Sequence, residues 1–172
     1  MVLLSLLRHA KSDWTQGIQS DHDRPLAPRG EKAAPLMGCH IAASGRLPDT
    51  VLCSTAVRAR QTFDLVLKEL PRAPRVEYLA ELYHAGPAAI IECLSRLPDS
   101  CRHSMVVGHN PGLQQLALEL ASRSDLAEVR TLVGKFPTAG LALYQFGGNW
   151  PDFGAKPAKL LEFVTPRGLG AP

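Results

Sequence analysis

The sequence lacks an apolar stretch long enough to cross a membrane and lacks the marks of an export signal. Its opening run, MVLLSLL, falls far short of the ~18–20 apolar residues that a membrane-spanning helix needs. No basic segment precedes this run, and no small-residue cleavage site follows it. We therefore expect a cytoplasmic protein that contacts no membrane.

Metal-binding and nucleotide-binding motifs are also missing. The four cysteines show neither a CxxC pair nor a zinc-type spacing, which predicts reduced thiols without disulfides. The sequence has no GxxxxGK, GxGxxG, GxSxG or HExxH motif. Four histidines pair at no metal-ligand spacing and are expected to be structural or surface residues: His22, His40, His84 and His103. We expect no metal and no organic cofactor.

A strong bias of charge is absent too. Nineteen Lys and Arg against sixteen Asp and Glu give a net charge of +3, and the arginines are scattered along the chain. A nucleic-acid-binding surface usually shows a clustered basic face, so we expect no nucleic-acid partner. The small basic excess is compatible with a site for a phosphorylated substrate.

What is present is a regular alternation of short strand patterns and helical patterns. Apolar residues make up 45% and charged residues 20% of the 172, which is typical of a globular protein, and we expect one domain, 1–172. Four strand–helix pairs predict an α/β fold, a three-layer αβα sandwich around a mostly parallel sheet. Strands are expected at 2–7, 50–54, 75–79 and 103–107, and helices at 28–43, 56–70, 86–97 and 112–123.

The last third of the chain follows a different pattern. The segments GLALYQF and AKLLEFV flank the turn-like GGNWPDFG. Two strand patterns around a turn predict an antiparallel pair, which would close one edge of the sheet.

Polar clusters follow three of the expected strands. Arg8 and His9 follow the first strand, residues 54–60 follow the second, and residues 108–110 follow the fourth. Because ligands bind at the carboxyl ends of parallel strands, we expect the three clusters to converge on one rim. The polar segment 9–26 is long for a simple connection, which also indicates a functional loop.

The residue types in these clusters fit a phosphoryl-transfer site. The guanidinium forks of Arg8 and Arg58 match phosphate oxygens, and nearby cations lower the pKa of a histidine so that its imidazole stays neutral and nucleophilic. Taken singly, each cluster has an ordinary structural interpretation, as a basic loop start, a solvated helix face or a tight turn. Their equivalent positions in one sheet favour the shared site.

Four motifs carry a resemblance to a known family. LLRHAKSDW, DRPLAPRG, CSTAVRARQT and VVGHNPG, in this order, resemble the histidine phosphatase superfamily, and more narrowly its small SixA-type phosphohistidine phosphatases. The resemblance implies a phosphoglycerate mutase-like fold. Ala10 stands where the superfamily signature has glycine, a replacement that is common in the SixA-like branch.

The resemblance also implies roles for single residues. His9 is expected to be the nucleophile that becomes phosphorylated, with Arg8 and Arg58 as phosphate ligands. His109 is expected beside the phosphate, where it stabilises the charge on the transferring group. Thr15 stands where mutase-like relatives often carry a phosphate-contacting asparagine, and is a candidate ligand. Water then hydrolyses the phosphohistidine, and fixed cations replace a metal.

The general acid is a step with two interpretations. The segment YLAELYHAG places Glu81 where many relatives carry a catalytic carboxylate, and the alternative is a surface glutamate at an element boundary. An alkoxide leaving group needs a proton donor, whereas an imidazole with a reference pKa of about 6.5 needs little help. A short chain of this kind therefore fits phosphohistidine better than a sugar phosphate.

The leading hypothesis is a phosphatase that acts on phosphohistidine in a phosphorylated protein partner. Two alternatives stay open: a phosphatase of small phosphate esters, and a non-catalytic phosphate- or phosphoprotein-binding module that keeps the arginines. Residues 12–24 and the segment around Tyr83 and His84 are expected to form the rim of the pocket. The sequence leaves open the identity of the partner, the oligomeric state and the role of Arg60.

Overall fold

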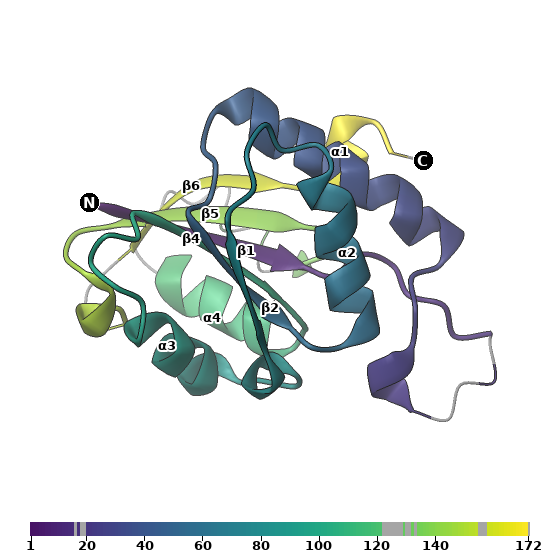
Figure 1. Cartoon of the computed structure of the whole chain (residues 1–172), viewed down its shortest axis with the longest axis horizontal. Coiled ribbons are helices and arrows are strands. Elements are labelled where there is room, and N and C mark those ends of the chain that lie inside the picture. The colour runs from purple at the N-terminus through teal and green to yellow at the C-terminus, as the bar shows by residue number, and fades with distance from the viewer. Residues whose placement is uncertain are drawn as a thin grey trace.

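Six strands form the central sheet of the protein, and helices cover both of its faces (Figure 1). The computed structural model describes residues 1–171 except 16, 18–19, 122–128, 130–131, 133 and 155–157. The strands are β1 (Val2–Arg8), β2 (Thr50–Ser54), β3 (Arg75–Leu79), β4 (His103–Gly108), β5 (Leu141–Phe146) and β6 (Ala158–Val164). The α-helices with complete bounds are α1 (Pro28–Ser44), α2 (Val57–Leu67), α3 (Pro87–Ser95) and α4 (Gly112–Ala121).

The order of the strands is β3-β2-β4-β1-β5-β6. The pairs β2–β3, β2–β4 and β1–β4 are parallel, whereas β5 pairs antiparallel with β1 and β6 pairs antiparallel with β5. The predicted mostly parallel sheet with an antiparallel pair at one edge is therefore confirmed. Strand β1 lies inside the sheet with strands on both sides, which explains why its sequence is an almost unbroken apolar run.

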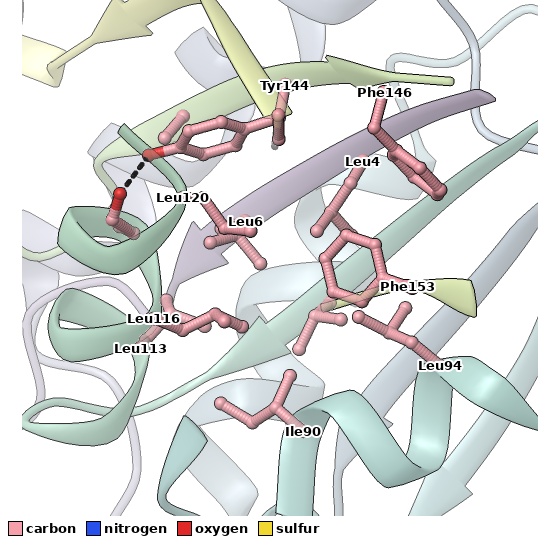
Figure 2. Close-up of a cluster of buried hydrophobic side chains, with 14 of the residues drawn as sticks. Leu4, Leu6, Ile90, Leu94, Leu113, Leu116, Leu120, Tyr144, Phe146 and Phe153 are labelled. Atoms are coloured by element: carbon pink, nitrogen blue, oxygen red, sulfur yellow. Dashed lines mark hydrogen bonds between the residues drawn. The ribbon is translucent and has the colours of Figure 1, made fainter. Parts of the chain in front are cut away.

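Side chains of each strand alternate between two hydrophobic clusters, one on each face of the sheet. Leu4 and Leu6 of β1 pack in the cluster covered by α3 and α4, which Figure 2 shows. Leu7 packs in the cluster covered by α1 and α2. The three-layer αβα sandwich is thereby confirmed, with one core on either side of the sheet.

One polar group lies inside the first of these clusters. Tyr144 of β5 is fully buried, and its hydroxyl donates to the carbonyl oxygen of Ala117 in α4 at 2.7 Å (Figure 2). Because the hydroxyl has a partner, the ring contributes its apolar area without the cost of an unpaired buried donor.

Two helices are shorter than their apolar patterns predict. The helix expected over 56–70 ends at Leu67, and the one expected over 86–97 ends at Ser95. Pro71 and Pro98 follow closely. A proline has no N–H to donate and its ring clashes with the carbonyl four residues before it, so the last helical turn before each proline is disfavoured. The expected end of the fourth helix at 123 lies outside the described residues. No helix in the described part of the chain is long and apolar enough to span a bilayer.

Candidate active site

The parallel register of the central strands sets where the candidate residues lie. Arg8 at the end of β1 pairs with Gly108 at the end of β4, so His9 and His109 leave the sheet side by side. The backbone N–H of His9 donates to the carbonyl oxygen of Gly108 at 3.0 Å, and the two imidazole centroids are 5.1 Å apart. Ser54 ends β2 on the other side of β4 and reaches the same rim.

The side chain of His9 is held in one tautomer. Its Nδ1 lies 2.8 Å from the carbonyl oxygen of Ala10, and because a carbonyl can only accept, Nδ1 carries the proton and Nε2 keeps its lone pair. Burial, followed by the charges of Arg58 and Arg8, lowers the pKa of His9 to about 3. The imidazole is therefore neutral at neutral pH, with Nε2 in the form that a nucleophile needs.

The turn after His9 is fixed to helix α2. The backbone N–H of Ala10 donates to Oγ1 of Thr62 at 2.9 Å, and that hydroxyl donates to the carbonyl oxygen of Arg58 at 2.6 Å. Ala10 is fully buried in the cluster beneath α1 and α2. The packing thus accommodates the methyl group of Ala10 directly after His9. The hydroxyl of Thr62 connects the backbone next to His9 to the helix that carries Arg58.

Ser54 fixes the ring of His109. Its Oγ accepts the backbone N–H of Ala56 at 3.3 Å and lies 2.8 Å from Nε2 of His109. We assign the hydroxyl proton to the bond with Nε2, which puts the imidazole proton on Nδ1. Nδ1 is buried and has no hydrogen-bond partner among the described residues. A buried donor of this kind, next to His9, is suited to an oxygen of a phosphoryl group.

The ring of His109 is neutral as well. Burial, followed by its proximity to His9 and the charge of Arg58, lowers the pKa of His109 to about 2. A neutral ring with its proton on Nδ1 donates a hydrogen bond without competing with His9 for phosphorus.

Both arginines are anchored at one end of the guanidinium group. Nη1 of Arg8 donates to the carbonyl oxygen of Phe136 at 2.8 Å. Nη1 and Nη2 of Arg58 donate to the carbonyl oxygen and to Oδ2 of Asp21, at 2.6 and 3.0 Å. The Nε atoms of both arginines are buried without a partner in the described residues. Each fork is therefore held in place while part of its donor set stays available for an anion.

Asp21 joins the loop before α1 to the rest of the site. Its Oδ1 accepts from Arg24 at 2.7 Å, and its Oδ2 accepts from the hydroxyl of Tyr83 at 2.8 Å as well as from Arg58. Partial burial acts to raise the pKa of Asp21, but the hydrogen bonds from Tyr83 and Arg24 and the charge of Arg58 hold it well below its usual range. The carboxylate stays ionised and orients two cations of the site.

Two aromatic rings after the 3₁₀ turn Ala80–Leu82 lie against His109. The centroid of Tyr83 is 5.6 Å from that of His109 in an edge-on contact. The ring of His84 is nearly parallel to His109, with a centroid distance of 6.3 Å, and its Nε2 lies 3.5 Å from Oδ2 of Asp21. His84 has a φ of 56°, in the left-handed region that non-glycine residues seldom adopt, and such strain is concentrated at functional sites.

The structure brings together four of the six residues named from the sequence: Arg8, His9, Arg58 and His109. The side chains of the other two are engaged elsewhere. Glu81 is 56% exposed and forms an ion pair with Arg96 of α3 at 3.7 Å. The backbone N–H and hydroxyl of Thr15 both donate to Oδ1 of Asp13, at 2.8 and 2.7 Å.

Sequence reasoning missed several residues of the site. Arg60, whose role it left open, lies over the ring of Tyr78 at 5.3 Å. Asp21 and His84 lie in segments that the sequence places at the rim, and Ser54 begins the cluster 54–60, but none of the three is assigned a role of its own from the sequence. The sequence does carry an indication for Ser54, because this residue ends the second strand and so reaches the rim.

Among the described residues, no group of three or more His, Cys, Asp or Glu side chains is placed to hold a metal ion.

The chain is similar in sequence to a phosphatase family. The profile of the histidine phosphatase superfamily (branch 1) matches residues 4–85. An uncharacterised protein of Mycobacterium tuberculosis is 43% identical over 163 residues, which are 94% of this chain and 100% of that protein.

Two solved structures share the fold over nearly the whole chain. A candidate phosphohistidine phosphatase SixA of Nakamurella multipartitia is 31% identical, with a TM-score of 0.83 and coverage of 96% of each chain. A candidate phosphohistidine phosphatase SixA of Agrobacterium tumefaciens is 26% identical, with a TM-score of 0.82 over 96% of this chain and 98% of that one. Family profile, identity and fold agree, and the chain belongs to the SixA-type branch of the histidine phosphatase superfamily.

Proposed function

We propose that the protein is a phosphatase that removes the phosphoryl group from phosphohistidine in a protein partner, through a phosphohistidine intermediate on His9. The observation that carries the proposal is the hydrogen bond from Nδ1 of His9 to the carbonyl oxygen of Ala10. It leaves the lone pair of Nε2 free on a neutral ring, beside two arginines and His109.

The reaction has two displacements at phosphorus. In the first, Nε2 of His9 attacks and the new N–P bond forms as the N–P bond of the substrate breaks. The substrate ring carries a proton on its other nitrogen, so it leaves as neutral imidazole and needs no further proton. In the second, water attacks the phosphorus, the N–P bond to His9 breaks, and phosphate leaves while the proton of water goes to solvent. Between the steps the ring of His9 is cationic, and the carbonyl oxygen of Ala10 stabilises that charge through Nδ1–H.

Fixed donors stabilise the phosphoryl group during both displacements. Arg8 and Arg58 offer guanidinium donors, and His109 offers the Nδ1–H that lacks a partner among the described residues. Because these groups are already held by Phe136 and Asp21, little reorganisation accompanies the transfer.

The position of Glu81 supports phosphohistidine as the substrate. An alkyl phosphate needs a proton donor for its leaving group, and the exposed Glu81 carboxylate is paired with Arg96. A leaving imidazole has a reference pKa of about 6.5 and departs without such a donor. The alternative activity on small phosphate esters predicts that Glu81→Gln severely lowers their turnover.

An exposed tryptophan supports a protein as the carrier of the phosphoryl group. Trp14 is 71% exposed, and the guanidinium of Arg24 lies 3.5 Å from its ring centroid. Arg24 in turn is bonded to Asp21 of the site. An ordered aromatic surface beside a catalytic pocket is a contact that protein partners use often.

Trapping of the intermediate tests the proposal. Single-turnover incubation with a protein carrying radiolabelled phosphohistidine is expected to leave acid-labile label on the wild-type enzyme and none on His9→Ala. His40→Gln is the matched control, because His40 lies near the C-terminal end of α1 and pairs with Glu162, and its label is expected to equal that of the wild type. His9→Ala should still bind phosphate through Arg8 and Arg58.

Two results would contradict the proposal. Phosphate binding without any label on the wild-type enzyme would favour a non-catalytic phosphate-binding module. Faster turnover of alkyl phosphates than of phosphohistidine, lost in Glu81→Gln, would favour a phosphatase of small esters.

A further inference from the structure

A cavity of about 470 Å³ lies next to the candidate active site and has a strongly basic lining. Arg8 forms part of its wall, but His9, Arg58 and His109 do not. No Asp or Glu of the described residues lines it. Six cationic side chains do: Arg8, Lys11, Arg29, Lys32, Lys135 and Arg167.

These cations come from segments that the fold brings together at the carboxyl-end rim of the sheet. Arg29 and Lys32 belong to the first half of α1, and Lys135 lies in the segment before β5. Arg167 lies in the 3₁₀ turn Pro166–Leu169 after β6. Figure 1 shows the C-terminal segment lying beside α1, and residues 165–167 with Ala171 form one wall of the cavity.

No carboxylate in the described ranges balances the positive charge of the cavity. None of the six cations forms an ion pair with a carboxylate of the described residues, whereas other arginines of the chain, such as Arg24, Arg58 and Arg96, do. Six charges also exceed the net charge of +3 of the whole chain. Basic residues that are scattered along the sequence are therefore concentrated around one cavity. Their mutual repulsion does not stabilise the fold, but their combined positive charge would attract an anion.

We propose that this cavity binds a polyphosphate anion, a ligand with two or more linked phosphate groups. A single phosphate brings at most about two negative charges and would leave most of the six cations uncompensated. Arg8, Arg29 and Arg167 supply forks that match phosphate oxygens. The hydroxyl of Thr165 accepts the N–H of Gly168 and keeps its own proton to donate.

The size and shape of the cavity favour a small ligand over an acidic segment of a protein. Its volume lies in the range of about 300–1,000 Å³ that small-molecule sites occupy. Residues of α1, the segment before β5 and the C-terminal segment line it. Apolar side chains such as Leu36 and Pro137 also line it, as expected of a formed pocket.

This inference goes beyond the proposed function, because binding in the cavity needs no phosphoryl transfer to His9. Arg8 connects the two sites: it lines the cavity, and its charge contributes to the lowered pKa of His9. A polyanion beside Arg8 is therefore expected to weaken the binding of orthophosphate at the histidines, and orthophosphate is expected to weaken polyanion binding by the same factor.

Calorimetric titration of the full chain with tripolyphosphate tests the proposal. The double variant Lys32→Ala/Arg167→Ala removes two exposed cations of the cavity that lie outside the candidate catalytic set. Lys68→Ala/Lys159→Ala is the matched control, because it removes the same charge from exposed positions outside the cavity. We expect 1:1 binding that weakens by about tenfold or more in the cavity variant and by less than about twofold in the control.

The outcomes separate this proposal from the proposed function. His9→Ala should bind tripolyphosphate like the wild type, so a failure of the phosphohistidine chemistry leaves the expected result intact. Equal losses in the cavity variant and the control would overturn the site as non-specific charge attraction. Loss in Arg58→Ala without loss in the cavity variant would place the anion at the histidines instead. Tighter binding of a penta-glutamate peptide than of tripolyphosphate would overturn the assignment to phosphate.

Discussion

Replacement of Ser54 by alanine tests how the end of β2 controls His109. The hydroxyl of Ser54 is fully buried, lies 2.8 Å from Nε2 of His109, to which we assign its proton, and accepts the N–H of Ala56 at 3.3 Å. In Ser54→Ala the Nε2 atom loses its partner, and the imidazole proton is no longer held on Nδ1. We expect both the stability and the activity to fall.

The contacts of Ser54 set the size of both effects. A buried polar atom left without a partner costs ~1–3 kcal/mol. We take a loss of about 2 kcal/mol in the free energy of unfolding. For a chain of this length each kcal/mol lowers the Tm by ~2–4 °C, so the Tm is expected to fall by about 4–8 °C. A preference for the Nδ1–H tautomer that drops by about 1 kcal/mol lowers the ratio of this tautomer to the other about fivefold, and kcat/KM falls by up to that factor. His109→Ala, which removes the donor itself, is expected to cost about 10²–10³-fold.

Ser104→Ala is the matched control for Ser54→Ala. Ser104 lies on the neighbouring strand β4 and is also fully buried, but its hydroxyl has no hydrogen-bond partner among the described residues. Its removal should leave the Tm unchanged or raise it, and kcat/KM should not change. The Tm from thermal unfolding and the kcat/KM for phosphohistidine, measured for both variants, test the prediction. Equal changes of Tm in the two variants, or an unchanged kcat/KM in Ser54→Ala, would refute the reasoning.

Two further predictions concern stability. Burial lowers the pKa of His103 to about 4, of His9 to about 3 and of His109 to about 2, whereas an unfolded histidine has a pKa of about 6.5. Below about pH 6.5 the unfolded chain thus binds more protons than the folded one. Urea titrations should therefore show that the free energy of unfolding falls from about pH 7 to 5, by up to ~1.4 kcal/mol per pH unit for each histidine. A free energy of unfolding that does not change with pH over this range would contradict the prediction. A Cβ on Gly112 would clash with the carbonyl oxygen of Ala85, so Gly112→Ala should destabilise the protein by about 1–3 kcal/mol, and a raised Tm would contradict the clash.

The layers of the fold are predictable because each strand has a local signal. Strand β1 reads as a short apolar run because it is buried on both faces, and the turn between β5 and β6 is marked by glycine and proline. Helix ends are less predictable, since apolar periodicity continues past Leu67 and Ser95 while the prolines that follow stop the helices. The length of an apolar periodic pattern in the sequence therefore does not give the length of the helix.

The grouping of Arg8, His9 and His109 needs only strand ends and a parallel sheet, and Arg58 joins them from the first turn of α2. Once β1 and β4 are adjacent and in register, the residues after them meet whatever the loops do. The role of Asp21 needs more, because it depends on where the loop between β1 and α1 turns and on side chains from α2 and the segment after β3. No periodic pattern in the sequence encodes that meeting.

Glu81 is a second case in which the sequence does not specify which side chains meet in the site. Its spacing before glycine fits a catalytic carboxylate, but spacing sets a position along the chain and not the direction of a side chain. The 3₁₀ turn Ala80–Leu82 leaves Glu81 facing Arg96, while Tyr83 and His84, two and three residues on, face His109. A single turn thus decides which residue of this segment meets the histidines, and it does so through backbone angles, including the positive φ of His84, that residue types alone do not specify.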